Sequence, residues 1–166
     1  MWLRGSQQLC INLVRHCRNK AMISDDVYQL DRFLKSQETI YHTALNELRA
    51  GRKQTHWMWF VFPQLRGLGC SLISQHFGIR SLDEARAYLS DSVLGARLRE
   101  STQMTLDIEG RSARDIFGFP DDLKFRSSMT LFCEAALPSD TVFQDALNHY
   151  FDGVKDEATL VLLGDF

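Results

Sequence analysis

The stretch DDVYQLDRFLKSQETIYHTALNELRAG, residues 25–51, has the periodicity that decides the fold class. Its apolar residues recur at steps of three and four, which is the spacing of one face of an α-helix. Asp25 and Asp26 suit the positive end of a helix, and Gly51 follows the last apolar position, as a C-cap does. The apolar positions are Val27, Leu30, Leu34, Tyr41, Ala44, Leu45 and Leu48. We therefore predict one long amphipathic helix that starts at residue 25 and ends before Gly51.

Helical patterns continue through the rest of the chain. The further predicted helices are residues 81–89, 92–109, 120–137, 139–153 and 156–166, together with a helical turn or two that starts at Ser112. Ser81 and Glu84 have the spacing of a capping box, and Pro120 is suited to the first position of a helix. Strand signals are almost absent, because no Asn-Gly or Asp-Gly pair separates two alternating runs. The sequence predicts a mainly α fold, a single compact helical domain of about seven helices with little or no β structure.

Length and composition are those of one soluble domain. The chain has 166 residues, of which 45% are hydrophobic and 24% charged. No apolar run approaches the roughly 18 residues that a membrane span needs. The four cysteines form no CxxC pair and have no histidine at metal-ligand spacing, so we predict reduced thiols in a cytoplasmic protein, with no metal site and no cofactor.

Charge is distributed unevenly along the chain. The first 21 residues, MWLRGSQQLCINLVRHCRNKA, hold four basic residues and no acidic one. This composition is typical of a transit peptide, but Met22 stands just before the predicted domain, so we favour an extension or an alternative start. Residues 22–166, the predicted single helical domain, hold 15 basic and 21 acidic residues. Such a balance gives no general attraction to nucleic acid or to an anionic membrane.

An aromatic stretch, THWMWFVFPQLRGLG, covers residues 55–69. Both faces of its apolar part are hydrophobic, so the pattern fits a buried strand or a helix buried all round. Because no partner strand is predicted elsewhere, we favour a helix or a helical turn that ends at Pro63. Trp57 and Trp59 each carry an indole N–H that needs a partner, which is compatible either with core packing or with the wall of a ligand pocket.

Three blocks of sequence resemble the signature blocks of the domain-of-unknown-function 1810 family, some of whose members carry a calpastatin-like label. The blocks are AGRKQTHWMWFVFPQLRGLG, FGIRSLDEARAYL and IFGFPDDLKFRSSMTLF, residues 50–69, 77–89 and 116–132. The resemblance covers roughly residues 26–163. It implies a mainly helical fold and carries over neither a reaction nor catalytic residues.

Two regions carry candidate site residues. In the first, His56 is a candidate general acid or base. Gln64 and Arg66 lie in a glycine-rich turn, where Arg66 could clamp a carboxylate or a phosphate. In the second, the helix that follows Pro120 carries Lys124, Ser127 and Ser128 on one side. Asp121 and Asp122 at its start are either capping residues or members of a site.

Two hypotheses on function follow. The first is a protein that binds a small anionic ligand, nucleotide-derived compounds included, or a small enzyme, with an aromatic-walled pocket. Its predicted catalytic residues are His56, Asp121, Lys124 and Ser128, and its predicted ligand-binding residues are Trp57, Trp59, Gln64, Arg66, Asp122 and Ser127. The alternative is a regulatory domain that exposes a Trp-rich surface to a protein partner. Nucleic acid is a disfavoured partner, and no membrane partner is predicted.

Overall fold

The computed structural model describes residues 27–164, and this part of the chain folds into nine helices. They are α2 (Asp31–Arg49), α3 (Met58–Val61), α4 (Leu72–Phe77), α5 (Leu82–Ser90), α6 (Leu94–Leu106), α7 (Ala113–Phe117), α8 (Asp121–Ala135), α9 (Val142–Phe151) and α10 (Glu157–Gly164). The predicted mainly α class and compact helical domain are confirmed, and the count exceeds seven by the short α3 and α4. The predicted extension over residues 1–21 lies outside the described residues.

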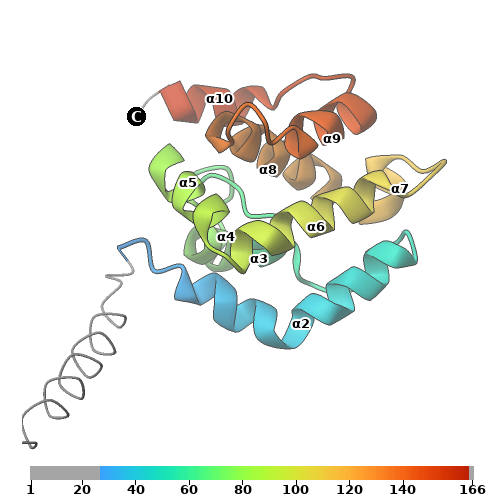
Figure 1. Cartoon of the computed structure of the whole chain (residues 1–166), viewed down its shortest axis with the longest axis horizontal. Helices are drawn as coiled ribbons and strands as arrows, with labels where there is room; N and C mark the ends of the chain where they lie inside the picture. The colour runs from blue at the N-terminus through green and yellow to red at the C-terminus, as the bar shows by residue number, and fades with distance from the viewer. Residues whose placement is uncertain (1–26, 165–166) are drawn as a thin grey trace, which may run out of the picture.

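The helices form a compact arrangement around α6 and α8. Figure 1 shows α2 along one side of the molecule and α8, α9 and α10 on the opposite side, with α6 crossing between them. Helix α6 packs against α2, α5 and α9, and α8 packs against α5, α7, α9 and α10. Between residues 27 and 164 no strand forms, and no helix is long and apolar enough to cross a bilayer.

Helix α2 starts six residues later than the pattern predicts. Residues 27–30 form a turn in which Gln29 has a φ of 55°. This left-handed conformation is incompatible with a continuous right-handed helix, so the prediction of a start at residue 25 is corrected to Asp31. The predicted end is confirmed, because Gly51 follows α2 with a φ of 68°, which a residue with a Cβ adopts only under strain.

Aromatic side chains hold the layers together. Phe33 of α2 meets Tyr88 of α5 edge-on, with ring centroids 5.1 Å apart, and Tyr88 lies 5.4 Å from Phe132 of α8. All three rings are buried. Each such pair contributes about 0.5–1.5 kcal/mol beyond the area it buries. These contacts fix the start of α2 against α5, which matters for the site described below.

The aromatic stretch of residues 55–69 forms one helical turn and then a loop. Helix α3 buries Met58, Phe60 and Val61, so the predicted helical turn is confirmed. The buried amide of Gln37 in α2 donates a 2.7 Å hydrogen bond to the carbonyl oxygen of Phe60. This bond anchors α3 to α2 within the core, where an unpaired carbonyl would be costly.

Candidate functional site

A parallel bridge brings Arg66 and Arg80 side by side. Its residues are Leu65 and Ile79, both buried. The N–H of Arg66 donates to the Ile79 carbonyl at 2.7 Å, and the N–H of Ile79 donates to the Gln64 carbonyl at 2.9 Å. Successive residues of an extended segment point to opposite sides. Because Leu65 and Ile79 point into the core, Arg66 and Arg80 both leave it on the other side.

The close approach of these two segments depends on Gly78. A Cβ atom at this position would lie 2.9 Å from the Cα and Cβ atoms of Arg66 and 2.9 Å from the carbonyl oxygen of Ser74. These separations are well inside van der Waals contact. Glycine is therefore required here for the bridge to form without displacing Arg66.

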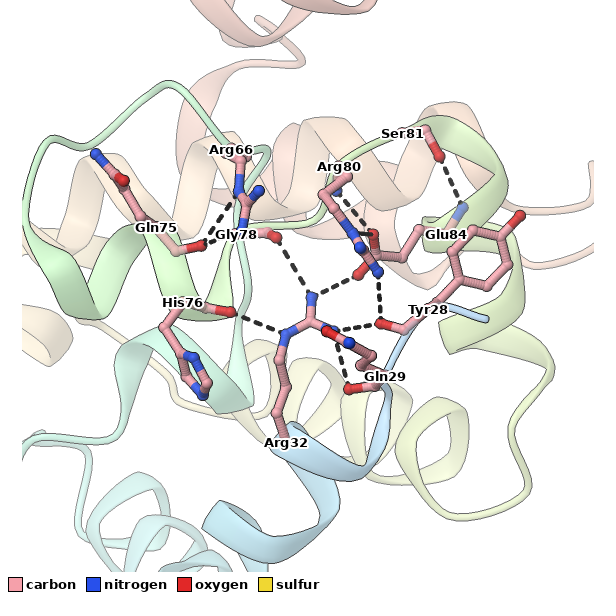
Figure 2. Close-up of polar contacts among 10 residues, drawn as sticks. All are labelled: Tyr28, Gln29, Arg32, Arg66, Gln75, His76, Gly78, Arg80, Ser81 and Glu84. Carbon is pink, nitrogen blue, oxygen red and sulfur yellow. Dashed lines mark hydrogen bonds and ion pairs between the residues drawn. The ribbon is translucent and has the colours of Figure 1, made fainter. Parts of the chain in front are cut away.

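Arg32 in the first turn of α2 lies at the centre of the site (Figure 2). Its guanidinium donates to four carbonyl oxygens and one carboxylate, those of Tyr28 (2.5 Å), Gln29 (3.0 Å), His76 (2.9 Å), Gly78 (3.3 Å) and Glu84 (2.5 Å). The side chain is only 10% exposed. All three nitrogens are thus bonded to protein, and Arg32 joins the start of α2 to α4 and α5.

The carboxylate of Glu84 is completely buried and is shared by two arginines. One oxygen accepts the bond from Arg32, and the other accepts from the backbone N–H and the Nε of Arg80, at 3.0 and 2.9 Å. The predicted capping box is therefore only half formed. Ser81 Oγ accepts from the Glu84 N–H as predicted, but Glu84 binds the arginines instead of returning to the Ser81 N–H. One negative charge faces two positive charges, which leaves an excess of positive charge.

These groups border a pocket of about 410 Å³, which we call the arginine pocket. It is lined by Gln29, Asp31, Arg32, Lys35, Ser36, Arg66, His76 and Arg80. Four basic side chains line it, against the carboxylates of Asp31 in the wall and Glu84 behind it. The pocket is therefore positively charged, although the domain around it has more acidic than basic residues.

Arg66 and Arg80 are held by protein groups through only part of each guanidinium. Arg66 donates from Nε and Nη2 to the Gln75 carbonyl, at 3.2 and 2.8 Å, and Arg80 donates from Nη2 to the Tyr28 carbonyl at 2.8 Å. Within residues 27–164, neither Nη1 has a hydrogen-bond partner. Two oriented guanidinium groups thus keep donors available to a ligand in the pocket.

The second predicted region forms a separate cluster of charges and tryptophans. Asp121 accepts from Lys124 at 2.7 Å and pairs with Lys53 at 2.6 Å. The ammonium of Lys124 lies 4.8 Å from the ring centroid of Trp59, and that of Lys53 lies 5.4 Å from Trp57. Burial alone would raise the pKa of Asp121, but the hydrogen bonds from both lysines hold this pKa below its ordinary value. Through these lysines, Trp57 and Trp59 lie close to the start of the helix that follows Pro120.

Trp57 is fully buried, and its indole is bonded to Glu47 of α2. The same carboxylate accepts from the N–H groups of Gln54 and Thr55 and from the Thr55 hydroxyl, at 2.7, 3.1 and 2.7 Å. Burial alone would raise the pKa of Glu47, but these hydrogen bonds outweigh it and keep the pKa below its ordinary value. Glu47 therefore fixes the loop that leads into α3, and Trp57 contributes to the core.

The other predicted site residues occupy varied environments. His56 is exposed, and Gln64 is half-buried next to the parallel bridge. The buried Asp122 accepts from the Leu123 N–H, and Ser127 donates to the Leu123 carbonyl. The remaining residue is Ser128, whose hydroxyl is fully buried and has no hydrogen-bond partner within the described part of the chain. Of the predicted set, Arg66 alone is among the residues that line the arginine pocket.

Most residues that line the arginine pocket are not marked by a pattern in the sequence. Arg32 and Lys35 are part of a helical pattern, His76 belongs to no motif, and Arg80 lies in a signature block that assigns it no role. Glu84 was assigned to a helix cap. A signal was nevertheless present, because Arg80 and Glu84 are four residues apart and flank the cap at Ser81. This spacing indicates an ion pair, but the sequence does not show whether the pair is buried or exposed.

Comparison with known proteins gives two matches. A family model described as "Protein of unknown function (DUF1810)" matches residues 27–163. The crystal structure of the conserved hypothetical protein Rv1873 from Mycobacterium tuberculosis is 50% identical in sequence and superposes with a TM-score of 0.82. That match covers 84% of this chain and 99% of the mycobacterial chain. No curated protein matches.

Proposed function

The chain belongs to the DUF1810 family of proteins of unknown function, and from the geometry of the arginine pocket we propose that it binds a small anionic ligand there. The observation that carries this proposal is the pair of neighbouring guanidiniums, Arg66 and Arg80, each with an Nη1 that no group in residues 27–164 occupies. Guanidinium groups bind phosphates and carboxylates through short, charge-assisted hydrogen bonds.

The rigidity of the pocket supports binding. Arg80 is fixed by Glu84 and the Tyr28 carbonyl, and Arg66 is fixed by the Gln75 carbonyl. Side chains that are already oriented lose little conformational entropy when a ligand arrives. Arg32 beneath them is saturated with protein acceptors, so it contributes charge and support more than direct contact.

Gln29 adds a further indication of function. It lines the pocket with a φ of 55°, a backbone conformation that is uncommon for residues other than glycine. Such strained residues cluster at functional sites, where the surrounding structure holds them in place. Here the Gln29 carbonyl is held by the N–H of Arg32 at 3.2 Å and by its guanidinium at 3.0 Å.

The anionic ligand and Arg66 are the same as in the sequence-based hypothesis. The proposed site is centred on the arginine pocket instead of on the tryptophans and the helix after Pro120. The cluster of Lys53, Asp121, Lys124 and Trp59 stays a second candidate site, supported by the unpartnered buried hydroxyl of Ser128 one helical turn from Lys124. A protein-binding surface built on tryptophan has less support, because Trp57 is fully buried and Trp59 is partly buried.

The proposal is tested by calorimetric titration of the full chain with inorganic phosphate at low ionic strength. We expect millimolar or tighter binding that weakens roughly tenfold in Arg66→Met, since one charge-assisted contact is lost. Arg86→Met is the matched control, because Arg86 is an exposed arginine outside the arginine pocket that pairs with Asp83. Equal affinities in the parent and Arg66→Met, or no binding at all, would overturn the proposal.

A further inference from the structure

Part of the lining of the arginine pocket comes from α2, and its chemistry differs from that of Arg66 and Arg80. Asp31 and Lys35 lie one turn apart there and form an exposed ion pair at 3.2 Å. Ser36 also belongs to this part of the lining, and its hydroxyl donates to the Arg32 carbonyl at 2.9 Å, which leaves the oxygen able to accept a hydrogen bond. Gln29 supplies an amide side chain at the edge. The pocket thus has a guanidinium side and a side of mixed donors and acceptors.

The volume of the pocket indicates a ligand larger than the anion alone. About 410 Å³ lies within the range of small-molecule sites, which start near 300 Å³. An inorganic phosphate bound to Arg66 and Arg80 leaves space next to α2. The organic part of a ligand would then face Asp31, Lys35, Ser36 and Gln29.

The lining favours a hydroxyl-rich organic part over a nucleobase. Bases are bound mainly by stacking on aromatic or apolar side chains. The single ring in this lining is the His76 imidazole, which packs edge-on against Phe77 at 4.7 Å. One face of the Arg32 guanidinium already lies over Phe33, at 4.3 Å from the ring centroid. Hydroxyl groups, in contrast, pair well with carboxylate, ammonium and hydroxyl groups such as those on α2, and with an amide such as that of Gln29.

Charge favours a phosphate over a carboxylate. Four basic side chains face two carboxylates, so the pocket has an excess of two positive charges. A phosphate monoester carries about two negative charges near neutral pH and has three terminal oxygens that accept hydrogen bonds. A carboxylate has one negative charge and two oxygens. On the basis of the proposed function, we infer that the arginine pocket takes a hydroxyl-rich phosphate monoester, with sugar phosphates as the ligand class.

The test compares four probes by calorimetric titration of the full chain: inorganic phosphate, glucose 6-phosphate, adenosine 5′-monophosphate and glucose. We expect glucose 6-phosphate to bind at least tenfold more tightly than inorganic phosphate, the nucleotide to bind no more tightly than phosphate, and glucose not to bind. In Ser36→Ala, the affinity for glucose 6-phosphate should fall severalfold while that for phosphate stays within twofold. Thr39→Ala, a change on the exposed face of the same helix, is the control.

The outcomes separate this inference from the proposed function. Equal affinities for phosphate and glucose 6-phosphate, both lost in Arg66→Met, would overturn the inference of a sugar phosphate ligand. They would still support the proposed binding of an anion. Tighter binding of the nucleotide would also overturn it. If the folded Ser36→Ala variant kept its affinity for glucose 6-phosphate, the inferred contact between α2 and the organic part of the ligand would be contradicted. Failure of all four probes to bind would overturn both.

Discussion

The indole Nε1 of Trp57 donates a 2.7 Å hydrogen bond to Oε2 of Glu47, and both residues are buried. The carboxylate accepts from four donors in the loop that enters α3. Trp57 in the aromatic stretch is thus hydrogen-bonded to the C-terminal part of α2. This bond orders the segment that leads to Arg66.

Replacing Glu47 by Gln should destabilise the protein by about 3 kcal/mol. The neutral amide cannot accept the same four hydrogen bonds, and its NH₂ group would face the N–H and O–H donors that now bind the carboxylate. Urea unfolding followed by tryptophan fluorescence measures the loss. Glu38→Gln is the control, since Glu38 is an exposed acid on the same helix, and its effect should stay within about 0.5 kcal/mol. A loss in Glu47→Gln no larger than in the control would contradict this role.

The same carboxylate predicts a pH dependence of stability. The pKa of Glu47 is lowered in the folded protein below its ordinary value of 4.5. The stabilisation from Glu47 is therefore fully present above about pH 4.5 and is lost as the pH falls through the folded pKa. The free energy of unfolding, measured by urea titration from pH 7 to pH 3, should fall less steeply with acid in Glu47→Gln than in the parent. Parallel curves would show that another group controls acid unfolding.

Removing the buried charge of Glu84 should be the most damaging single change at the arginine pocket. Glu84→Gln leaves Arg32, whose side chain is 10% exposed, without its counter-charge, and we expect a loss of about 3–5 kcal/mol. The matched control is Asp83→Asn, because Asp83 is the preceding acid on α5 and forms an exposed ion pair with Arg86. That pair should contribute under about 1 kcal/mol. Similar losses in the two variants would mean that Glu84 is not the support of the site.

The sequence predicted the helices better than it predicted the site, and the reason is the range of the interactions. Helix periods, caps and the glycine after α2 are local features, and α5 through α10 lie close to the predicted ranges. The start of α2 was missed because the left-handed Gln29 is fixed by Arg32 in three dimensions. A tertiary contact of this kind leaves no local pattern.

The place of Arg66 in a glycine-rich turn predicts that it could clamp an anion, but no sequence pattern indicates which residues lie beside it. Its position beside Arg80 depends on the register of one parallel bridge between two short segments. A shift of one residue in either segment would turn the arginine of that segment toward the core. Such a register is set by buried Leu65 and Ile79 and by Gly78, and it becomes visible only in the folded structure.

Gly78→Ala tests this register directly. The added methyl group would lie 2.9 Å from Cα of Arg66 and from the Ser74 carbonyl oxygen, so the bridge must open. We expect a loss of stability of about 2 kcal/mol and weaker phosphate binding. Gly164→Ala is the comparison, because its methyl group would meet no atom within 4 Å. If Gly78→Ala kept both the stability and the phosphate affinity of the parent, the close approach would not be needed.

In the cluster around Asp121, we predict that removing the carboxylate destabilises the protein more than removing the ammonium group of Lys124. Asp121→Asn leaves two ammonium groups together, and the side chain of Lys53 is only 7% exposed, so we expect a loss of about 2 kcal/mol. Lys124→Met keeps the pair between Lys53 and Asp121 and keeps an apolar contact with Trp59, so the loss should be about 0.5 kcal/mol. Urea unfolding of both variants measures the order. A larger loss in Lys124→Met than in Asp121→Asn would show that the lysine over Trp59, and not the shared carboxylate, holds this part of the fold.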